Sequence, residues 1–154
     1  MEICDLLSTE CILSTVRATS KKQALQELAT HAAKISGQNE RAIFDVILER
    51  ERLGTTGIGR GVAIPHGKLL GLDRPYGVFA KFKQPIDFEA VDDQTVDMVF
   101  LLLAPENAGA DHLKALARIS RMFRDPEMCK KLRAAKDDSA LCKLLLKKSK
   151  ADAA

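Results

Sequence analysis

The chain lacks most of the features that mark a specialised class of protein. It has no tryptophan and one tyrosine in 154 residues, and its formal net charge is only +3. That charge is too small to indicate a nucleic-acid partner, and acidic residues are interspersed among the lysines and arginines that follow residue 114. No uninterrupted apolar run approaches the length of a membrane span, and the N-terminus has no signal-peptide pattern. We therefore expect a cytoplasmic protein that is not embedded in a membrane.

The four cysteines also lack a functional pattern. Cys4, Cys11, Cys129 and Cys142 contain no Cys-x-x-Cys pair and no zinc-ligand spacing. In a cytosolic chain such residues are usually small, reduced and partly buried. The cysteines therefore predict neither a disulfide nor a metal site.

The residues that are present describe an ordinary globular protein. Hydrophobic residues make up 46% of the chain and charged residues 29%. A chain of this length and composition can form one domain around an ordinary core. We expect a single domain over residues 1–148 and a disordered tail over residues 149–154.

The order of the predicted elements indicates the fold class. Ser20 is a good N-cap and Gly37 a good C-terminal stop for a first helix, and Asn39 caps a second one that leads into a glycine-rich loop. Apolar and alternating runs predict strands over residues 12–16, 62–64, 77–83 (with one face partly wet), 86–88 and 98–104, and helices near 111–123, 126–134 and 139–148. This order predicts an α/β (α+β-like) sandwich, with a mixed, largely central β-sheet flanked by helices.

The stretch from residue 50 to residue 68 is the most informative in the chain. Glycines at positions 54, 57, 59 and 61 lie in a predicted loop. Their spacing does not match the dinucleotide fingerprint, and no Gly-Lys-Ser/Thr follows at P-loop spacing. Residues 62–64 form a predicted buried strand that Pro65 ends, because proline cannot donate to a sheet ladder. His66 is therefore expected at a strand end, where a rigid proline holds it, and this is a suitable place for a reactive imidazole.

Arg50 and His112 are two further candidates. Arg50 continues the apolar stripe of the second helix, where it either extends over apolar surface or binds an anion beside His66. His112 lies in the first turn of a later helix, where the helix N-terminus favours anions and keeps a histidine neutral. Taken alone, such a residue is more often a capping or packed one. Because sites gather at strand ends in open α/β sheets, we expect both histidines in one site. Arg60 adds a positive charge to the glycine loop, either as a phosphate ligand or as a solvated residue.

These residues favour phosphoryl transfer over commoner reaction types. No nucleophile elbow and no cysteine in a suitable setting indicates a hydrolase. A metal site built from His66 and His112 lacks an obvious third ligand. His66 as a nucleophile, with Arg50 and His112 donating to an anion, meets the main needs of phosphoryl transfer. The attacking nitrogen must be unprotonated, so the other nitrogen needs a hydrogen-bond partner that the sequence does not reveal.

Two motifs carry a resemblance to a known family. Residues 54–59 (GTTGIG) and 61–68 (GVAIPHGK) resemble the phosphohistidine region of the IIA proteins of the bacterial phosphotransferase system, in the mannitol, fructose and nitrogen-regulatory superfamily. Residues 74–79 and 85–88 resemble the nitrogen-regulatory branch of that superfamily, and the resemblance extends over nearly the whole chain.

The resemblance implies a IIA-type fold and a role for each candidate residue. It implies that His66 accepts a phosphoryl group from the phosphohistidine of a small carrier protein, which a first enzyme charges from phosphoenolpyruvate. His112 and Arg50 would stabilise the transferring group, and no metal, nucleotide or other cofactor is implied. On the nitrogen-regulatory branch, the phosphorylation state of such a phosphotransferase component controls a downstream regulatory protein or transporter. The alternatives are a sugar-specific IIA protein that passes phosphate to a IIB domain, and an anion- or metal-binding module that is never phosphorylated.

Overall fold

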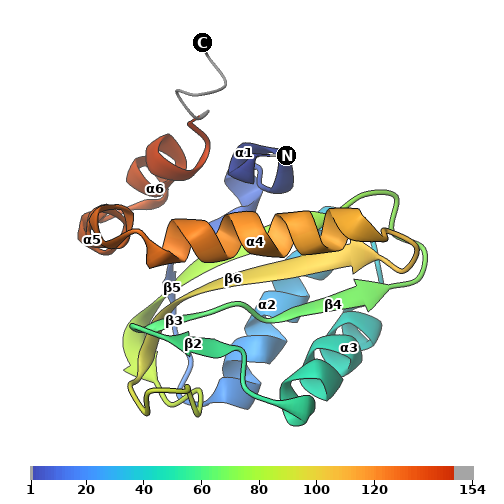
Figure 1. The fold of residues 1–154 in the computed structure, drawn as a ribbon, viewed down its shortest axis with the longest axis horizontal. Helices are drawn as coiled ribbons and strands as arrows, with labels where there is room; N and C mark the ends of the chain where they lie inside the picture. The colour runs from blue at the N-terminus through green and yellow to red at the C-terminus, as the bar shows by residue number, and fades with distance from the viewer. Residues whose placement is uncertain (1, 148–154) are drawn as a thin grey trace.

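The computed structural model describes residues 2–147, in which a mixed sheet lies between two layers of helices (Figure 1). The described residues form a six-stranded sheet in the order β1-β5-β6-β3-β2, and β4 also pairs with β6. β1 and β5 are parallel, β5 and β6 are antiparallel, and β3 and β4 both run parallel to β6. The strands are β1 Ile12–Val16, β2 Gly57–Gly59, β3 Val62–Ala63, β4 His66–Leu69, β5 Tyr76–Ile86 and β6 Val96–Pro105. The predicted mixed, central sheet is therefore confirmed.

Helices cover both faces of this sheet (Figure 1). One layer holds α2 Lys21–Ser36 and α3 Glu40–Leu53, and the other holds α1 Ile3–Leu6, α4 Ala110–Arg124, α5 Pro126–Ala134 and α6 Asp138–Leu145; a short 3₁₀ turn, η1 Thr9–Cys11, precedes β1. Alternate residues of the central strands divide between two hydrophobic clusters, because successive side chains of a strand point to opposite faces. Val99 and Leu101 of β6 join the cluster of α2 and α3, whereas Phe100 and Leu102 join the cluster of α4.

The first two helices begin and end where the sequence predicts. Ser20 Oγ accepts a hydrogen bond from the backbone N–H of Gln23 at 3.2 Å, and Gly37 ends α2 in the left-handed region at φ 75°. Asn39 Oδ1 accepts from the backbone N–H of Ala42 at 2.9 Å and begins α3. These caps satisfy backbone groups that the helix itself leaves free, so local chemistry alone determines the ends.

The prediction of a separate strand over residues 86–88 is wrong. β5 continues through Pro85 to Ile86, which pairs with Val96 of β6 after an irregularity that begins beyond Lys81. The irregular pairing accommodates a proline that has no N–H to donate. The partly wet face predicted for this strand is confirmed at its far end, where Lys81 is half-buried and Lys83 exposed, whereas residues 76–80 are all buried between β1 and β6.

The C-terminal part of the chain agrees with the sequence in outline. Asp125 caps α5 and Pro126 occupies its first turn, so this helix begins where the sequence predicts. α6 begins at Asp138, one residue earlier than predicted, and ends at Leu145, short of the predicted end near residue 148. The tail predicted over 149–154 lies outside the described residues. Over residues 2–147 no helix combines the length and apolar character needed to cross a membrane; the cytoplasmic location stays a prediction.

Candidate functional site

The glycine-rich stretch is a β-hairpin and not the loop predicted from its glycines. β2 and β3 pair antiparallel, with Gly57 opposite Ala63. The turn between them is Arg60 and Gly61, which both have positive φ, at 60° and 81°. The Arg60 backbone N–H donates to Asp92 at 2.9 Å, and its guanidinium lies 3.4 Å from the carbonyl oxygen of Arg124. Arg60 does not line the cavity that contains His66, so the phosphate-ligand alternative for this residue finds no support.

His66 begins a strand, whereas the sequence predicts it just beyond the end of one. β3 ends at Ala63 and β4 begins at His66, with His66 opposite Leu102 of β6. Between them, the Pro65 carbonyl accepts from the Leu102 backbone N–H at 3.0 Å. Proline interrupts only the donor side of the ladder, so pairing with β6 resumes at once. The break fixes the backbone directly before the imidazole.

The structure identifies the partner of the His66 ring. Its Nδ1 lies 2.8 Å from the carbonyl oxygen of Ile64. A carbonyl can only accept, so Nδ1 carries the proton and Nε2 keeps its lone pair. Burial lowers the pKa of His66, the hydrogen bond to Ile64 opposes that effect, and the Arg50 charge lowers the pKa further. His66 is therefore neutral near pH 7, with Nε2 as its nucleophilic atom.

His112 lies beside His66, as the sequence predicts. It occupies the first turn of α4, is buried, and its ring centroid is 5.8 Å from that of His66 with the planes tilted by 48°. Burial lowers the pKa of His112, and the charges of His66 and Lys68 lower it further. Among the buried side-chain nitrogen and oxygen atoms of the described chain, Nδ1 of His112 is without a hydrogen-bond partner.

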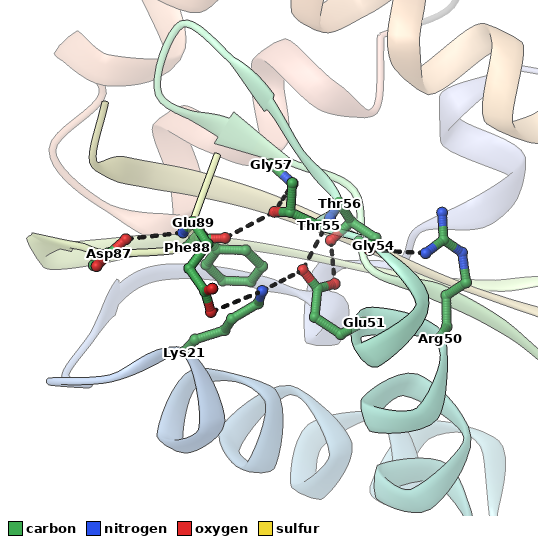
Figure 2. A network of polar contacts seen from close by, with 10 residues as sticks. All are labelled: Lys21, Arg50, Glu51, Gly54, Thr55, Thr56, Gly57, Asp87, Phe88 and Glu89. Carbon is green, nitrogen blue, oxygen red and sulfur yellow. Dashed lines mark hydrogen bonds and ion pairs between the residues drawn. The ribbon is translucent and has the colours of Figure 1, made fainter. Parts of the chain in front are cut away.

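Arg50 reaches the same cavity from the last turn of α3. Its Nη1 donates to the carbonyl oxygen of Gly54 at 2.9 Å (Figure 2). α3 lies close to β4 at Gly67, where a Cβ would overlap Cγ1 of Val46. The resulting cavity of about 660 Å³ is lined by Arg50, His66 and His112 together with Asp45, Val46, Glu49, Leu53, Gly67 and Lys68. The three residues proposed from the sequence therefore meet in one cavity.

Sequence reasoning missed Glu51, whose side chain is buried in the last turn of α3, next in sequence to Arg50. Glu51 is 6% exposed, and its carboxylate contacts Lys21 and Thr56 (Figure 2). The signal was present, because Glu51 follows Ile43 and Ile47 at intervals of four and so continues the buried stripe of α3. Charged residues on helices are usually solvated, so the apolar stripe alone did not distinguish the buried Glu51 from the exposed charged residues beside it.

The described part of the chain offers no set of ligands for a metal ion. Over residues 2–147, no group of three or more His, Cys, Asp or Glu side chains is placed to hold a metal ion. The four cysteines, which all lie in that range, are free. The cavity instead combines a neutral nucleophilic imidazole, a second imidazole and a guanidinium, which suits an anionic group.

Comparisons with known proteins agree with this description. The family model of the phosphoenolpyruvate-dependent sugar phosphotransferase system, EIIA 2, matches residues 5–148. A nitrogen regulatory protein of Bradyrhizobium diazoefficiens is 61% identical over 145 residues, which are 94% of this chain and 95% of that protein. The crystal structure of the nitrogen regulatory protein IIA-Ntr from Neisseria meningitidis has a TM-score of 0.87 and 31% identity, over 93% of this chain and 98% of that one. The crystal structure of IIA mannitol from Escherichia coli has a TM-score of 0.76 and 20% identity, over 90% and 98%, a likeness of fold alone.

Proposed function

The chain belongs to the EIIA 2 family of the phosphoenolpyruvate-dependent sugar phosphotransferase system, on its nitrogen-regulatory branch, and from this membership we propose that His66 is its phosphoryl acceptor. The observation that supports this proposal most directly is the 2.8 Å contact from His66 Nδ1 to the Ile64 carbonyl oxygen. It leaves Nε2 unprotonated and directed by a fixed ring, as an in-line nucleophile requires.

In the proposed step, Nε2 of His66 attacks the phosphorus of a phosphohistidine on a small carrier protein. A nitrogen–phosphorus bond forms at Nε2 while the nitrogen–phosphorus bond to the carrier's imidazole breaks, and that imidazole leaves with the bonding electron pair. The Nδ1 proton stays on His66 and remains donated to Ile64. The reaction exchanges one such bond for another of the same kind, so its main requirements are alignment and charge stabilisation.

Arg50 and His112 supply the groups that would face the phosphoryl oxygens. Arg50 carries a permanent charge, and its bond to Gly54 uses only one of its five N–H groups. For His112, a buried N–H without an acceptor would be costly, so the proton is expected on Nε2 and Nδ1 keeps its lone pair. His112 would then donate Nε2–H to a phosphoryl oxygen without adding a charge that repels the neighbouring imidazole.

The branch indicates what the phosphorylated protein does. Identity to a nitrogen regulatory protein is 61% over almost the whole of both chains, against 20% for the mannitol protein. We propose that the chain is a phosphotransferase component that acts mainly as a regulator, whose phosphorylation state controls a downstream regulatory protein or transporter. The sugar-specific alternative differs in requiring transfer onward to a IIB domain.

Intact-mass spectrometry after incubation with phosphoenolpyruvate, the first enzyme and the carrier protein tests the acceptor. Wild type should gain one acid-labile phosphoryl group, and His66→Ala should gain none. His112→Ala should still accept the group, but slowly. The remaining histidine, His31, lies half-buried on α2 and does not line the cavity, so His31→Ala is the matched control and should behave as wild type.

Two results would overturn the assignment. If wild type gains no phosphoryl group while the same carrier charges a known acceptor, the chain is a binding module and not a phosphoryl acceptor. If His66→Ala is still phosphorylated at the wild-type rate, the acceptor is another residue.

A further inference from the structure

Glu51 is a buried carboxylate whose oxygens are both occupied. Oε1 accepts from the backbone N–H of Thr56 at 2.9 Å, and Oε2 accepts from the Thr56 hydroxyl at 2.6 Å (Figure 2). Lys21 Nζ lies 2.8 Å from Oε1, with side chains only 17% and 3% exposed. Burying two charges is costly, so a pair that only stabilised the fold would bring little advantage over apolar residues. The arrangement indicates a second use for the carboxylate.

A chain of hydrogen bonds runs from this carboxylate to the His66 ring. Glu51 holds Thr56, and the Thr56 carbonyl accepts from the Ile64 backbone N–H at 3.0 Å. The Ile64 carbonyl in turn lies 2.8 Å from Nδ1 of His66. Three contacts therefore connect the last turn of α3 to the imidazole by way of the β2–β3 hairpin. A shift of Thr56 would pass to the carbonyl that orients the ring.

We propose that Glu51 is a positioning residue for phosphoryl transfer, which fixes the Ile64 carbonyl and thereby the orientation and tautomer of His66. The proposal rests on His66 being the acceptor. When Nε2 bonds to phosphorus the ring becomes positive, and the Nδ1–H that points at Ile64 is then donated more strongly. A displaced carbonyl would lose this stabilisation and would let the proton move to Nε2, where it blocks the attack.

Orientation is the larger of the two ways in which Glu51 can act. Its charge raises the pKa of His66, but this is the smallest of the contributions to that pKa, after burial, Ile64 and Arg50. Lys21 lies against the carboxylate and cancels much of its field at a distance. The contacts to Thr56 are short and direct, so Glu51 acts mainly through geometry.

The same network also holds the segment that contacts Arg50. The loop between α3 and β2 runs from Gly54 to Thr56; Arg50 binds its first residue and Glu51 its last. Thr55 connects this loop to the segment that follows β5, since its hydroxyl donates to the Phe88 carbonyl at 2.8 Å (Figure 2). Release of Glu51 would therefore loosen both the acceptor and the guanidinium beside it.

Thr56→Val and Glu51→Gln test the proposal at similar side-chain volume. Valine removes the 2.6 Å contact, and glutamine replaces the charged carboxylate by an amide that has one accepting oxygen instead of two. The maximum rate of phosphorylation by the charged carrier should fall roughly tenfold, which is the low end of the effect seen when a metal-bound histidine loses its hydrogen-bond partner. The KM for the carrier should be unchanged. Nitrogen NMR of His66 should show the Nδ1–H tautomer in wild type and a mixture of tautomers in the variants. Thr56→Ser, which restores the hydroxyl, should recover the wild-type rate and tautomer.

Glu89→Gln is the control for charge. Glu89 is the other carboxylate near Lys21, at 3.8 Å and 78% exposed, and it does not contact Thr56; its variant should transfer at the wild-type rate. If Glu51→Gln does not fold, because it leaves the Lys21 ammonium buried, the double variant with Lys21→Met and the single variant Thr56→Val decide the matter. Wild-type rates and a single tautomer in a folded Glu51→Gln or Thr56→Val protein would overturn the positioning role while wild type still accepts phosphate. Failure of wild type to accept phosphate would instead overturn the proposed function.

Discussion

Replacing Gly67 by alanine measures how closely α3 must approach β4 for the site to form. Gly67 follows His66 on β4, and it is buried against Val46 in the middle of α3. A Cβ at this position would overlap Cγ1 of Val46, whereas the next nearest atom, Cβ of Val46, would lie at an ordinary 3.7 Å. One methyl group of one residue therefore decides whether alanine fits.

Two opposing effects set the expected stability. Gly67 has no positive φ, so alanine can adopt its backbone and should stabilise the fold by about 0.4–1 kcal/mol through the unfolded chain. The overlap with Val46 acts the other way, because overpacking a closely packed interface costs about 1–3 kcal/mol. We expect the overlap to win by roughly 1–2 kcal/mol, which lowers the Tm by about 2–8 °C in a chain of this size. Transfer to His66 should also slow, since α3 carries Arg50.

A double-mutant cycle with Val46→Ala gives the reasoning its sharpest test. Val46→Ala alone should cost about 1 kcal/mol, because Val46 is only partly buried. In that background Cγ1 is gone, so Gly67→Ala should change sign and stabilise the protein by about 0.4–1 kcal/mol. Urea unfolding followed by far-ultraviolet circular dichroism measures all four proteins. An equal loss in both backgrounds, or a neutral effect in the wild-type one, would refute the steric explanation.

Two further predictions concern stability. Burial lowers the pKa of His66 and of His112, so below the ordinary value of about 6.5 the unfolded chain binds more protons than the folded one. Stability should be full above that pH and decline as the pH falls below it; urea midpoints measured from about pH 8 down to about pH 5 should show this decline, and a double His→Gln variant should show less of it. Lys81 Nζ donates to three carbonyls at the C-terminal end of α5, at 2.7 to 3.0 Å, so Lys81→Met should cost about 1.5–3 kcal/mol in thermal melts. Lys83→Met, at an exposed position of the same strand, should cost almost nothing, and equal melting temperatures for the two variants would contradict this account.

Features that depend on neighbours in sequence could be predicted, and features that depend on partners across the sheet could not. Ser20, Gly37 and Asn39 determine helix ends through contacts within four residues. The continuation of β5 through Pro85 depends instead on β6, because Ile86 pairs with Val96. A proline next to a glutamine indicates a turn when it is considered alone, and only the long partner strand overrides that preference.

The site divides in the same way. The motif at residues 61–68 identifies His66, and the apolar stripe of α3 identifies Arg50. His112 is identified by its position at the start of a predicted helix. The sequence does not reveal that the Ile64 carbonyl accepts the His66 proton, because every residue has a backbone carbonyl. The place of Glu51 on the buried stripe of α3 was visible, but its ion pair with Lys21 of α2, at 2.8 Å, was not. The candidate residues of the site could therefore be predicted from the sequence, whereas the groups that hold them could not.

Burial gives this site its chemical character by acting on all of its members at once. It keeps both imidazoles neutral, so the only permanent charge of the three candidates is that of Arg50, which matches an incoming anion. The same burial would be harmful if the His66 proton could move, because a neutral histidine protonated at Nε2 cannot attack phosphorus. The Ile64 carbonyl prevents this movement, because it accepts the proton that Nδ1 carries. A buried nucleophilic histidine needs such a fixed acceptor as much as it needs a lowered pKa. In the proposed mechanism, the hairpin next to Ile64 and the carboxylate of Glu51 therefore contribute to phosphoryl transfer as well as to the fold.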